Sequence, residues 1–219
     1  MRRSDWGRVA LVVAALWGRQ GAQAAVEPVV DTAAADTVAT AGAATDLARR
    51  VLQSADHGGS PFAIVDKQAA VILVYRADGT LAGASSVLLG QTPGDQSVAG
   101  VGERTQQGRL LVGDRTTPAG RFASEPGHNL AGESIVWIDY DAALAIHRLR
   151  PGPAMAPREQ RLASSSARDK RVSAGCVVVP EWFYDAVVQP VLGRSRAVVY
   201  VMPEQSAWND MFRLSSAAR

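Results

Sequence analysis

Short apolar runs, separated by turn-forming residues, dominate the chain between residues 61 and 203. Runs of this length that are rich in β-branched and aliphatic side chains, with Gly, Asp and Pro between them, are typical of strands. They lie at Phe62–Lys67, Ala70–Tyr75, Leu81–Leu89, Ile135–Ile138, Ala143–Ile146, Val177–Val179 and Ala197–Val201. We therefore predict a mainly β domain whose strands are joined by short turns.

Few segments have a pattern that favours helix. The best candidate is Glu181–Leu192, which begins after Pro180 and which Pro190 is expected to kink or end. Shorter helices are predicted within Thr45–Gln53 and Ser206–Leu214. The domain is therefore expected to contain one or two short helices beside its strands.

The first 24 residues have the three-part layout of a secretory signal peptide. Arg2, Arg3 and Arg8 precede the apolar run Val9–Trp17, and Ala22-Gln23-Ala24 supplies small residues for cleavage. The run is too short for a mature membrane span, which needs about 20 residues. We expect export to the periplasm with no stable membrane insertion after cleavage; an uncleaved N-terminal anchor is the alternative.

The remaining chain divides into three parts. Residues 25–60 are rich in Ala and Thr and are expected to form a flexible tether with a possible short helix. Residues 61–205 form the predicted domain, and residues 206–219 form a C-terminal tail. Four of the 23 basic and one of the 21 acidic residues lie in residues 1–24, which leaves 19 against 20 and a net charge of −1. With sparse aromatic residues and no basic stripe, the chain is not expected to bind nucleic acid.

Cys176 is the only cysteine in the sequence. A lone cysteine in an exported protein has no internal disulfide partner, so it is incidental, forms an intermolecular disulfide or is a thiol kept for chemistry. Its surroundings favour chemistry, because Ser173-Ala174-Gly175-Cys176 is a small-residue turn that leads into an apolar run. Such a turn can hold a sulfur at the end of a strand, with backbone N–H groups exposed beside it.

A catalytic thiol needs a base that removes its proton. Of the three histidines, His57 lies in the expected tether and His128 in a predicted loop at residues 125–129. His147 follows a predicted strand, and a base on a rigid strand end suits proton transfer better. His147 is therefore the candidate base; the alternative is a partly buried histidine that is hydrogen-bonded to the backbone.

Four segments together resemble the catalytic domain of the L,D-transpeptidases, cysteine enzymes that cross-link bacterial peptidoglycan. The segments Ile64–Lys67 and Ile72–Tyr75 are similar to the family's opening hairpin, and Thr116–Phe122 to its T-P-x-G-x-F loop. Ile146-His147 resembles the family's strand-terminal histidine, and Ser173–Cys176 its S-x-G-C motif. The four occur in the family's order, and the resemblance spans about Pro61 to Pro203.

The resemblance implies a fold, a chemistry and a site. The fold is a β-sandwich or barrel of mixed strands with one or two short helices. Cys176 is the implied nucleophile and His147 the base, with Ser173 and Gly175 completing the catalytic turn. Backbone N–H groups of the turn are expected to bind the oxyanion, and Ser173 alternatively satisfies only its own turn. The expected partners are peptidoglycan stem peptides, bound near Thr117, Arg148, Arg171 and Ala174, with no cofactor and no metal.

The sequence departs from the family at three positions and in one length. Ala174 stands where the family usually has a second histidine, Val178 where it has Arg or Asn, and Arg148 where it has Gly. The segment from His147 to Cys176 is also longer than usual. Pro151-Gly152-Pro153 and Ala163–Ala167 indicate a mobile loop, and seven basic against two acidic residues between residues 148 and 171 make it positively charged. The loop either covers the cleft and attracts carboxylates, or is merely solvated.

Three functions remain open from the sequence. The leading one is a transpeptidase that passes a Cys176 thioester to an amine. A close variant uses water as acceptor and is a carboxypeptidase or amide hydrolase. The third keeps the fold as a peptidoglycan-binding module without turnover. No zinc spacing or phosphate-binding glycine loop is present, and the sequence predicts no oligomeric state.

Overall fold

All seven predicted apolar runs contain strands in the computed structural model, which describes residues 41–214. Their bounds are β1 Phe62–Asp66, β2 Val71–Tyr75, β3 Leu81–Ser86, β6 Ser134–Asp139, β7 Leu144–Arg148, β9 Val177–Val179 and β10 Ala197–Val201. A long strand, β5 Gly120–His128, joins them, and the short strands β4 Leu89–Gly90 and β8 Arg171–Ser173 pair with each other. The signal peptide predicted at residues 1–24 lies outside the described residues.

Within residues 41–214, eight strands form one mixed sheet in the order β3-β2-β1-β10-β5-β6-β7-β9. Two pairs are parallel, β1 with β10 and β7 with β9, and the rest are antiparallel. Leu88, just after β3, pairs with Val178 of β9, so the chain at one edge of the sheet returns to the other edge. The sheet therefore nearly closes around its main apolar core, which confirms the predicted mainly β class.

Strand β5 was not predicted, because its sequence has no apolar run. Most of its residues are exposed or half-buried, and it contains Pro126 and Gly127. Backbone pairing with β10 on one side and β6 on the other holds it in the sheet. The T-P-x-G-x-F segment therefore runs directly into a strand, and His128 ends that strand rather than lying in a loop.

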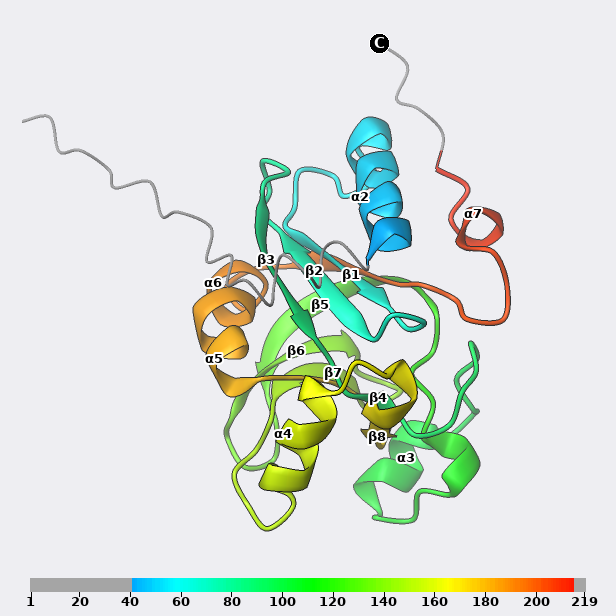
Figure 1. The fold of residues 1–219 in the computed structure, drawn as a ribbon, viewed down its shortest axis with the longest axis vertical. Coiled ribbons are helices and arrows are strands. Elements are labelled where there is room, and N and C mark those ends of the chain that lie inside the picture. Colours follow the sequence, from blue (N-terminus) through cyan, green and yellow to red (C-terminus); the bar gives the residue numbers. More distant parts are fainter. Residues whose placement is uncertain (1–40, 215–219) are drawn as a thin grey trace, which may run out of the picture.

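Helix α2, Gly42–Ser54, covers the outer side of the sheet near β1. Ala44, Leu47, Ala48 and Val51 are buried in a second apolar cluster that includes residues of β1, β2 and β10. Helix α2 confirms the short helix predicted within Thr45–Gln53, but from residue 41 onward the chain is part of the packed domain rather than a flexible tether. Helix α7, Trp208–Met211, also packs on this cluster, on the same side as α2 (Figure 1).

The predicted helix at residues 181–192 is confirmed as one continuous helical segment. It consists of α5 Glu181–Phe183, a π-helical turn Tyr184–Val188 and α6 Gln189–Val191. Pro190 does not end it, since the wider π-helical turn precedes the residue that lacks an N–H. Phe183, Tyr184, Val187 and Val188 fill the main core.

Two further helices lie on the side of the molecule opposite α2, near β4 and β8 (Figure 1). Helix α4, Met155–Ala163, lies within the segment between His147 and Cys176 where we expected a mobile loop, and so corrects that expectation in part. Its Leu162 is buried with Leu88, Leu149 and Val178, so an apolar contact orders the segment. Helix α3, Val101–Gln106, was also not predicted. It packs closely, since a Cβ on Gly102 would lie 1.9 Å from the carbonyl oxygen of Asp141. No helix in residues 41–214 has the length and hydropathy to cross a membrane.

A buried charge cluster, defined here as Lys67, Asp95, Arg171 and Glu204, joins four separate segments of the chain. The fully buried Lys67 Nζ donates to Asp95 Oδ1 at 2.7 Å, to the Gly94 carbonyl at 2.5 Å and to the Thr117 carbonyl at 3.0 Å. Arg171 pairs with Glu204 and donates to the Lys67 carbonyl at 3.0 Å. Burial lowers the pKa of Lys67, and the hydrogen bond with Asp95 opposes that shift. The ammonium group thus depends on its protein partners because water does not reach it.

We predict that Lys67→Met lowers the free energy of unfolding by about 3–5 kcal/mol, because it leaves the buried carboxylate of Asp95 without its cation. Urea denaturation followed by circular dichroism measures the change. Arg49→Gln is the matched control, since Arg49 forms an exposed pair with Asp46 at 2.9 Å and should change stability by less than about 0.5 kcal/mol. Equal unfolding midpoints for both variants would show that the cluster contributes no stability.

Candidate active site

The segment Ser173–Cys176, called the cysteine turn below, connects β8 to β9 and is closed by its own hydroxyl group. Ser173 Oγ donates to the Cys176 carbonyl at 2.7 Å and accepts the Gly175 N–H at 3.1 Å. The alternative weighed for Ser173, a hydroxyl that satisfies its own turn, is therefore what these contacts show. Because the Gly175 N–H already donates to Ser173, it is not available to bind an oxyanion.

Glycine is required at position 175 by both backbone conformation and space. Its φ is +128°, a value that side-chain-bearing residues rarely adopt, and an added Cβ would lie 2.9 Å from the Thr116 carbonyl oxygen. The cysteine turn therefore packs directly on the backbone of residue 116. This contact explains why a Gly precedes Cys176.

Thr117 anchors the cysteine turn rather than facing a substrate. It is fully buried, and its hydroxyl donates to the Gly175 carbonyl at 2.6 Å and accepts the Gly90 N–H at 2.8 Å. Its own carbonyl accepts from Lys67. The expected substrate-binding role of Thr117 is thus replaced by a structural one. Thr117 therefore connects the buried charge cluster to the cysteine turn.

His147 lies near the C-terminal end of β7, as predicted, and is half-buried. Its Nδ1 lies 2.8 Å from the Arg148 carbonyl oxygen. Because a carbonyl only accepts, Nδ1 carries the proton and Nε2 is left with a free lone pair. Burial is the main cause that lowers the pKa of His147, while the backbone hydrogen bond raises it less. The imidazole is therefore neutral near pH 7 and chemically able to accept a proton.

Strand register brings His147 and Cys176 to one face of the sheet. In the parallel pairing of β7 with β9, His147 is opposite Val178 and Ile146 is opposite Val177. Val177 lies in the main core and Val178 in the cluster under α4, so successive β9 residues face opposite sides. Cys176 lies one residue before β9, and the same alternation continued to it would place it on the side of Val178. The two candidate residues are therefore diagonal neighbours.

The sulfur makes its contacts with the backbone around the β6–β7 turn. Cys176 Sγ donates to the Ala143 carbonyl at 3.6 Å, and no hydrogen bond within residues 41–214 joins it to His147. Burial raises the pKa of the thiol, opposed by the Ala145 backbone and by the charge of Arg150. The charge of Arg150 also lowers the pKa of His147, which agrees with the closeness of Cys176 and His147 that we infer from the strand register. In this state the thiol is protonated and the base is not yet engaged.

A cavity of about 40 Å³ lies beside the sulfur. Its lining includes residues 174–176 of the cysteine turn, residues 142–144, Asp114, Thr116, Pro118 and residues of α3. Asp114 is held in place by Arg104, whose Nε and Nη2 each donate to it at 2.7 Å. Peptide-sized ligands need roughly 300 Å³ or more. A peptide must therefore reach the sulfur from the exposed side at Ala174, or the segment that carries α3 must move.

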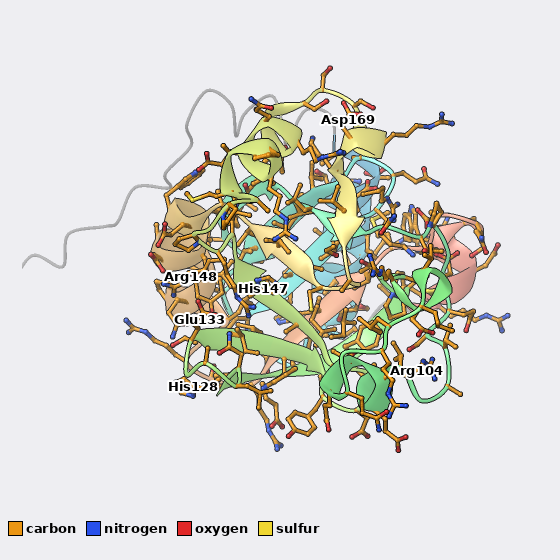
Figure 2. The ribbon with its side chains drawn as sticks, turned by 90° about the horizontal axis from the view of Figure 1, so that it is seen from below. Arg104, His128, Glu133, His147, Arg148 and Asp169 are labelled. Atoms are coloured by element: carbon orange, nitrogen blue, oxygen red, sulfur yellow. The ribbon has the colours of Figure 1, made fainter. Side chains whose placement is uncertain are left out.

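Arg148 and Arg171 are in ion pairs that do not face this cavity. Arg148 Nη2 lies 3.0 Å from Asp185 Oδ1, and its guanidinium stacks 4.7 Å from the Tyr184 ring centroid. Arg171 belongs to the buried charge cluster. Each charge is paired, although Arg148 Nε and Arg171 Nη1 are buried without a hydrogen-bond partner within residues 41–214, and the substrate-binding roles of both residues stay predictions. Figure 2 shows Arg148 near His147 and Glu133 on the lower face, with Arg104 farther along it.

The other histidines lie away from the cysteine turn. His57 is buried and hydrogen-bonded to the Ser60 carbonyl at 2.9 Å, and His128 is exposed at the end of β5. Within residues 41–214, no group of three or more His, Cys, Asp or Glu side chains could hold a metal ion. Sequence reasoning missed Ala143 and Asp114, since a backbone carbonyl and a carboxylate from an unpredicted segment give no recognisable motif.

Comparison with known proteins gives matches only among solved structures. No family model matches the chain, and neither does any curated protein. An L,D-transpeptidase from Xylanimonas cellulosilytica is 16% identical with a TM-score of 0.38, over 65% of this chain and 60% of that one. The helical cell shape determining protein Pgp2 from Campylobacter jejuni is 14% identical with a TM-score of 0.42, over 68% and 49%. The catalytic domain of the E. faecium L,D-transpeptidase is 18% identical with a TM-score of 0.33, over 66% and 98%.

These structures include the family that the sequence motifs resemble. The chain spans about half to three fifths of the length of the first two. At identities below 20% and TM-scores below 0.5, the role of a residue in those proteins cannot be transferred to this chain. The chemistry of its site therefore rests on the contacts described above.

We predict that iodoacetamide alkylates Cys176 slowly at pH 7 and faster as the pH rises past 9, because burial raises the pKa of the thiol above its usual 9.0. A bulky maleimide should react more slowly still, since the cavity is small. Mass spectrometry follows the reaction, with urea-unfolded protein as the control. Folded protein that reacts faster than unfolded protein at pH 7 would contradict a protonated resting thiol.

Proposed function

We propose that the protein is a cysteine acyltransferase of the L,D-transpeptidase type that acts on peptidoglycan stem peptides. The observation that carries the proposal is the shared face of β7 and β9. On it, a single thiol on a rigidly closed turn neighbours a neutral histidine whose free nitrogen is Nε2. The four sequence motifs support the same function. Peptidoglycan, the proposed substrate, lies outside the cytoplasmic membrane, in agreement with the signal peptide expected at residues 1–24.

The reaction begins when the sulfur leaves the Ala143 carbonyl and turns toward His147. Nε2 takes the thiol proton, and the thiolate attacks the carbonyl carbon between an L-centre and a D-centre of the donor stem. His147 then gives its proton to the leaving nitrogen, and the terminal D-residue departs as a free amine. The product is a Cys176 thioester. An acceptor amine attacks it, His147 removes the amine's proton, and the thiol is restored with a new amide bond.

The oxyanion of each tetrahedral intermediate is bound by the N–H groups of Ala174 and Cys176. Neither N–H donates to a backbone partner in residues 41–214, whereas Gly175 N–H is already used by Ser173. Ala174 is exposed, which gives an incoming carbonyl access from solvent. A single donor of this kind is typically worth about 3 kcal/mol of transition-state stabilisation.

The acceptor decides between two forms of this activity. An amine acceptor cross-links or remodels the cell wall, and water trims stems as a carboxypeptidase or amide hydrolase does. Both forms share the thioester and the same two side chains. The distinction depends only on which acceptor reaches the acyl-enzyme.

A second candidate, a peptidoglycan-binding module without turnover, is favoured by one observation. The thiol is protonated and bonded to Ala143 rather than to His147. Such a module keeps its affinity for stems or sacculi when Cys176 and His147 are both replaced, and it forms no covalent product.

We predict that purified protein lacking residues 1–24, incubated with tetrapeptide stems, gains the mass of an acyl group with loss of the terminal D-residue. Intact-protein mass spectrometry detects the adduct. Cys176→Ala should give none, and His147→Gln should slow its formation by a factor of roughly 100 to 10,000, the usual contribution of a general base. Stem binding without any adduct on the parent protein would replace the acyltransferase with the binding module.

The pH dependence of acylation tests the role of His147 separately. A base acts in its neutral form, and burial lowers the pKa of His147 below its usual 6.5. We predict that kcat/KM stays high as the pH falls to 6.5 and is lost only at lower pH. Hydrolysed D-residue, measured from pH 4.5 to 8, gives the profile. An acidic limb centred above pH 7 would rule out a neutral, buried His147 as the base.

A further inference from the structure

We propose that Arg158 of α4 binds the terminal carboxylate of the donor's leaving D-residue. The inference rests on the proposed function, which it deepens by naming the group that the site recognises.

Arg158 lies on the side of α4 that packs against the protein. Met155, Arg158 and Leu162 are spaced i, i+3 and i+7, so they share one face of the helix. Leu162 is buried in the cluster with Leu88, Leu149 and Val178, and Met155 packs against the same cluster. Arg158, half-buried between them, is therefore directed to the β9 face rather than to open solvent.

That face is the one that carries His147. Val178, in the cluster under α4, is the strand partner of His147. Arg158 is close enough to the imidazole that its charge contributes to lowering the pKa of His147. Helix α4 thus places a guanidinium on the same face as the candidate base.

The charge of Arg158 is not balanced within the described part of the chain. Among the charges that shift the pKa of His147, the cations are Arg150 and Arg158 and the anion is Glu133, while the adjacent Arg148 pairs with Asp185. Arg150 pairs with Glu133 at 2.8 Å. In residues 41–214, no hydrogen bond or ion pair engages the guanidinium of Arg158. A half-buried guanidinium without an anion favours a carboxylate ligand, which it can bind through two parallel hydrogen bonds.

The proposed reaction indicates which carboxylate Arg158 binds. His147 protonates the nitrogen of the leaving D-residue, so that residue must lie over the imidazole when the carbonyl carbon is at Cys176. The leaving residue is the last of the stem and therefore ends in a free carboxylate. Its position, one residue beyond the scissile bond on the His147 side, coincides with the side from which Arg158 approaches.

Arg161 provides a matched control on the same helix. It has the same charge but is exposed, and its Nη1 donates to the Asp169 carbonyl at 2.8 Å. A general effect of positive charge on α4 would make the two arginines equivalent. A carboxylate site at Arg158 makes them different.

The test is peptide binding to the Cys176→Ala protein, which removes turnover from the measurement. Isothermal titration calorimetry compares a tetrapeptide stem that ends in a carboxylate with the same stem ending in an amide. Arg158→Gln should weaken binding of the carboxylate peptide roughly tenfold to a hundredfold and leave the amide peptide within about twofold. Arg161→Gln should change neither, and Arg158→Lys should recover part of the loss.

Circular dichroism confirms that each variant is folded. The proposal is overturned if Arg158→Gln weakens both peptides equally or neither, or if Cys176→Ala binds neither peptide. The acylation assay on the parent protein reports independently on function. Carboxylate-selective binding through Arg158 without an acyl adduct keeps this site and removes only the acyltransferase activity.

Discussion

The ammonium group of Lys67 is the interaction on which the geometry of the site depends. It is buried at the end of β1 and donates to Asp95 and to the carbonyls of Gly94 and Thr117. A charge removed from water is tolerated only with such partners, so it fixes the segments that supply them. The carbonyl of Thr117 accepts from Lys67, and its hydroxyl donates to the Gly175 carbonyl. The position of the cysteine turn therefore depends on the buried charge cluster. Lys67 thereby helps to position the sulfur through Thr117 and the cysteine turn.

The two candidate catalytic residues are positioned by different physical means. Backbone pairing of β7 with β9 places His147, and a set of side-chain hydrogen bonds places Cys176. The register makes them neighbours, while the sulfur rests against Ala143. A protonated thiol and a neutral imidazole form a resting pair that substrate binding must bring into contact. A protonated, partly buried thiol is also less readily oxidised than an exposed thiolate.

The sequence predicted those parts of the structure that depend on local pattern. Apolar runs located seven strands, and the small-residue turn and strand-end histidine located Cys176 and His147. Strand β5 was missed because long-range pairing with β10 and β6, rather than an apolar run, holds its polar residues in the sheet. Helix α4 was missed because a few buried contacts of Leu162 decide its structure. The contacts of Thr117, Arg148 and Arg171 could not be predicted, since their partners are 58, 37 and 33 residues away in sequence.

The most direct test of the account is a crystal structure of the Cys176→Ala protein with a bound tetrapeptide stem. The account predicts that the scissile carbonyl oxygen accepts from the N–H groups of residues 174 and 176. The leaving nitrogen should lie within hydrogen-bond reach of His147 Nε2, about 2.6–3.2 Å or one water away. A peptide bound with its scissile bond against α3 and the imidazole on the other side of β7 would contradict it.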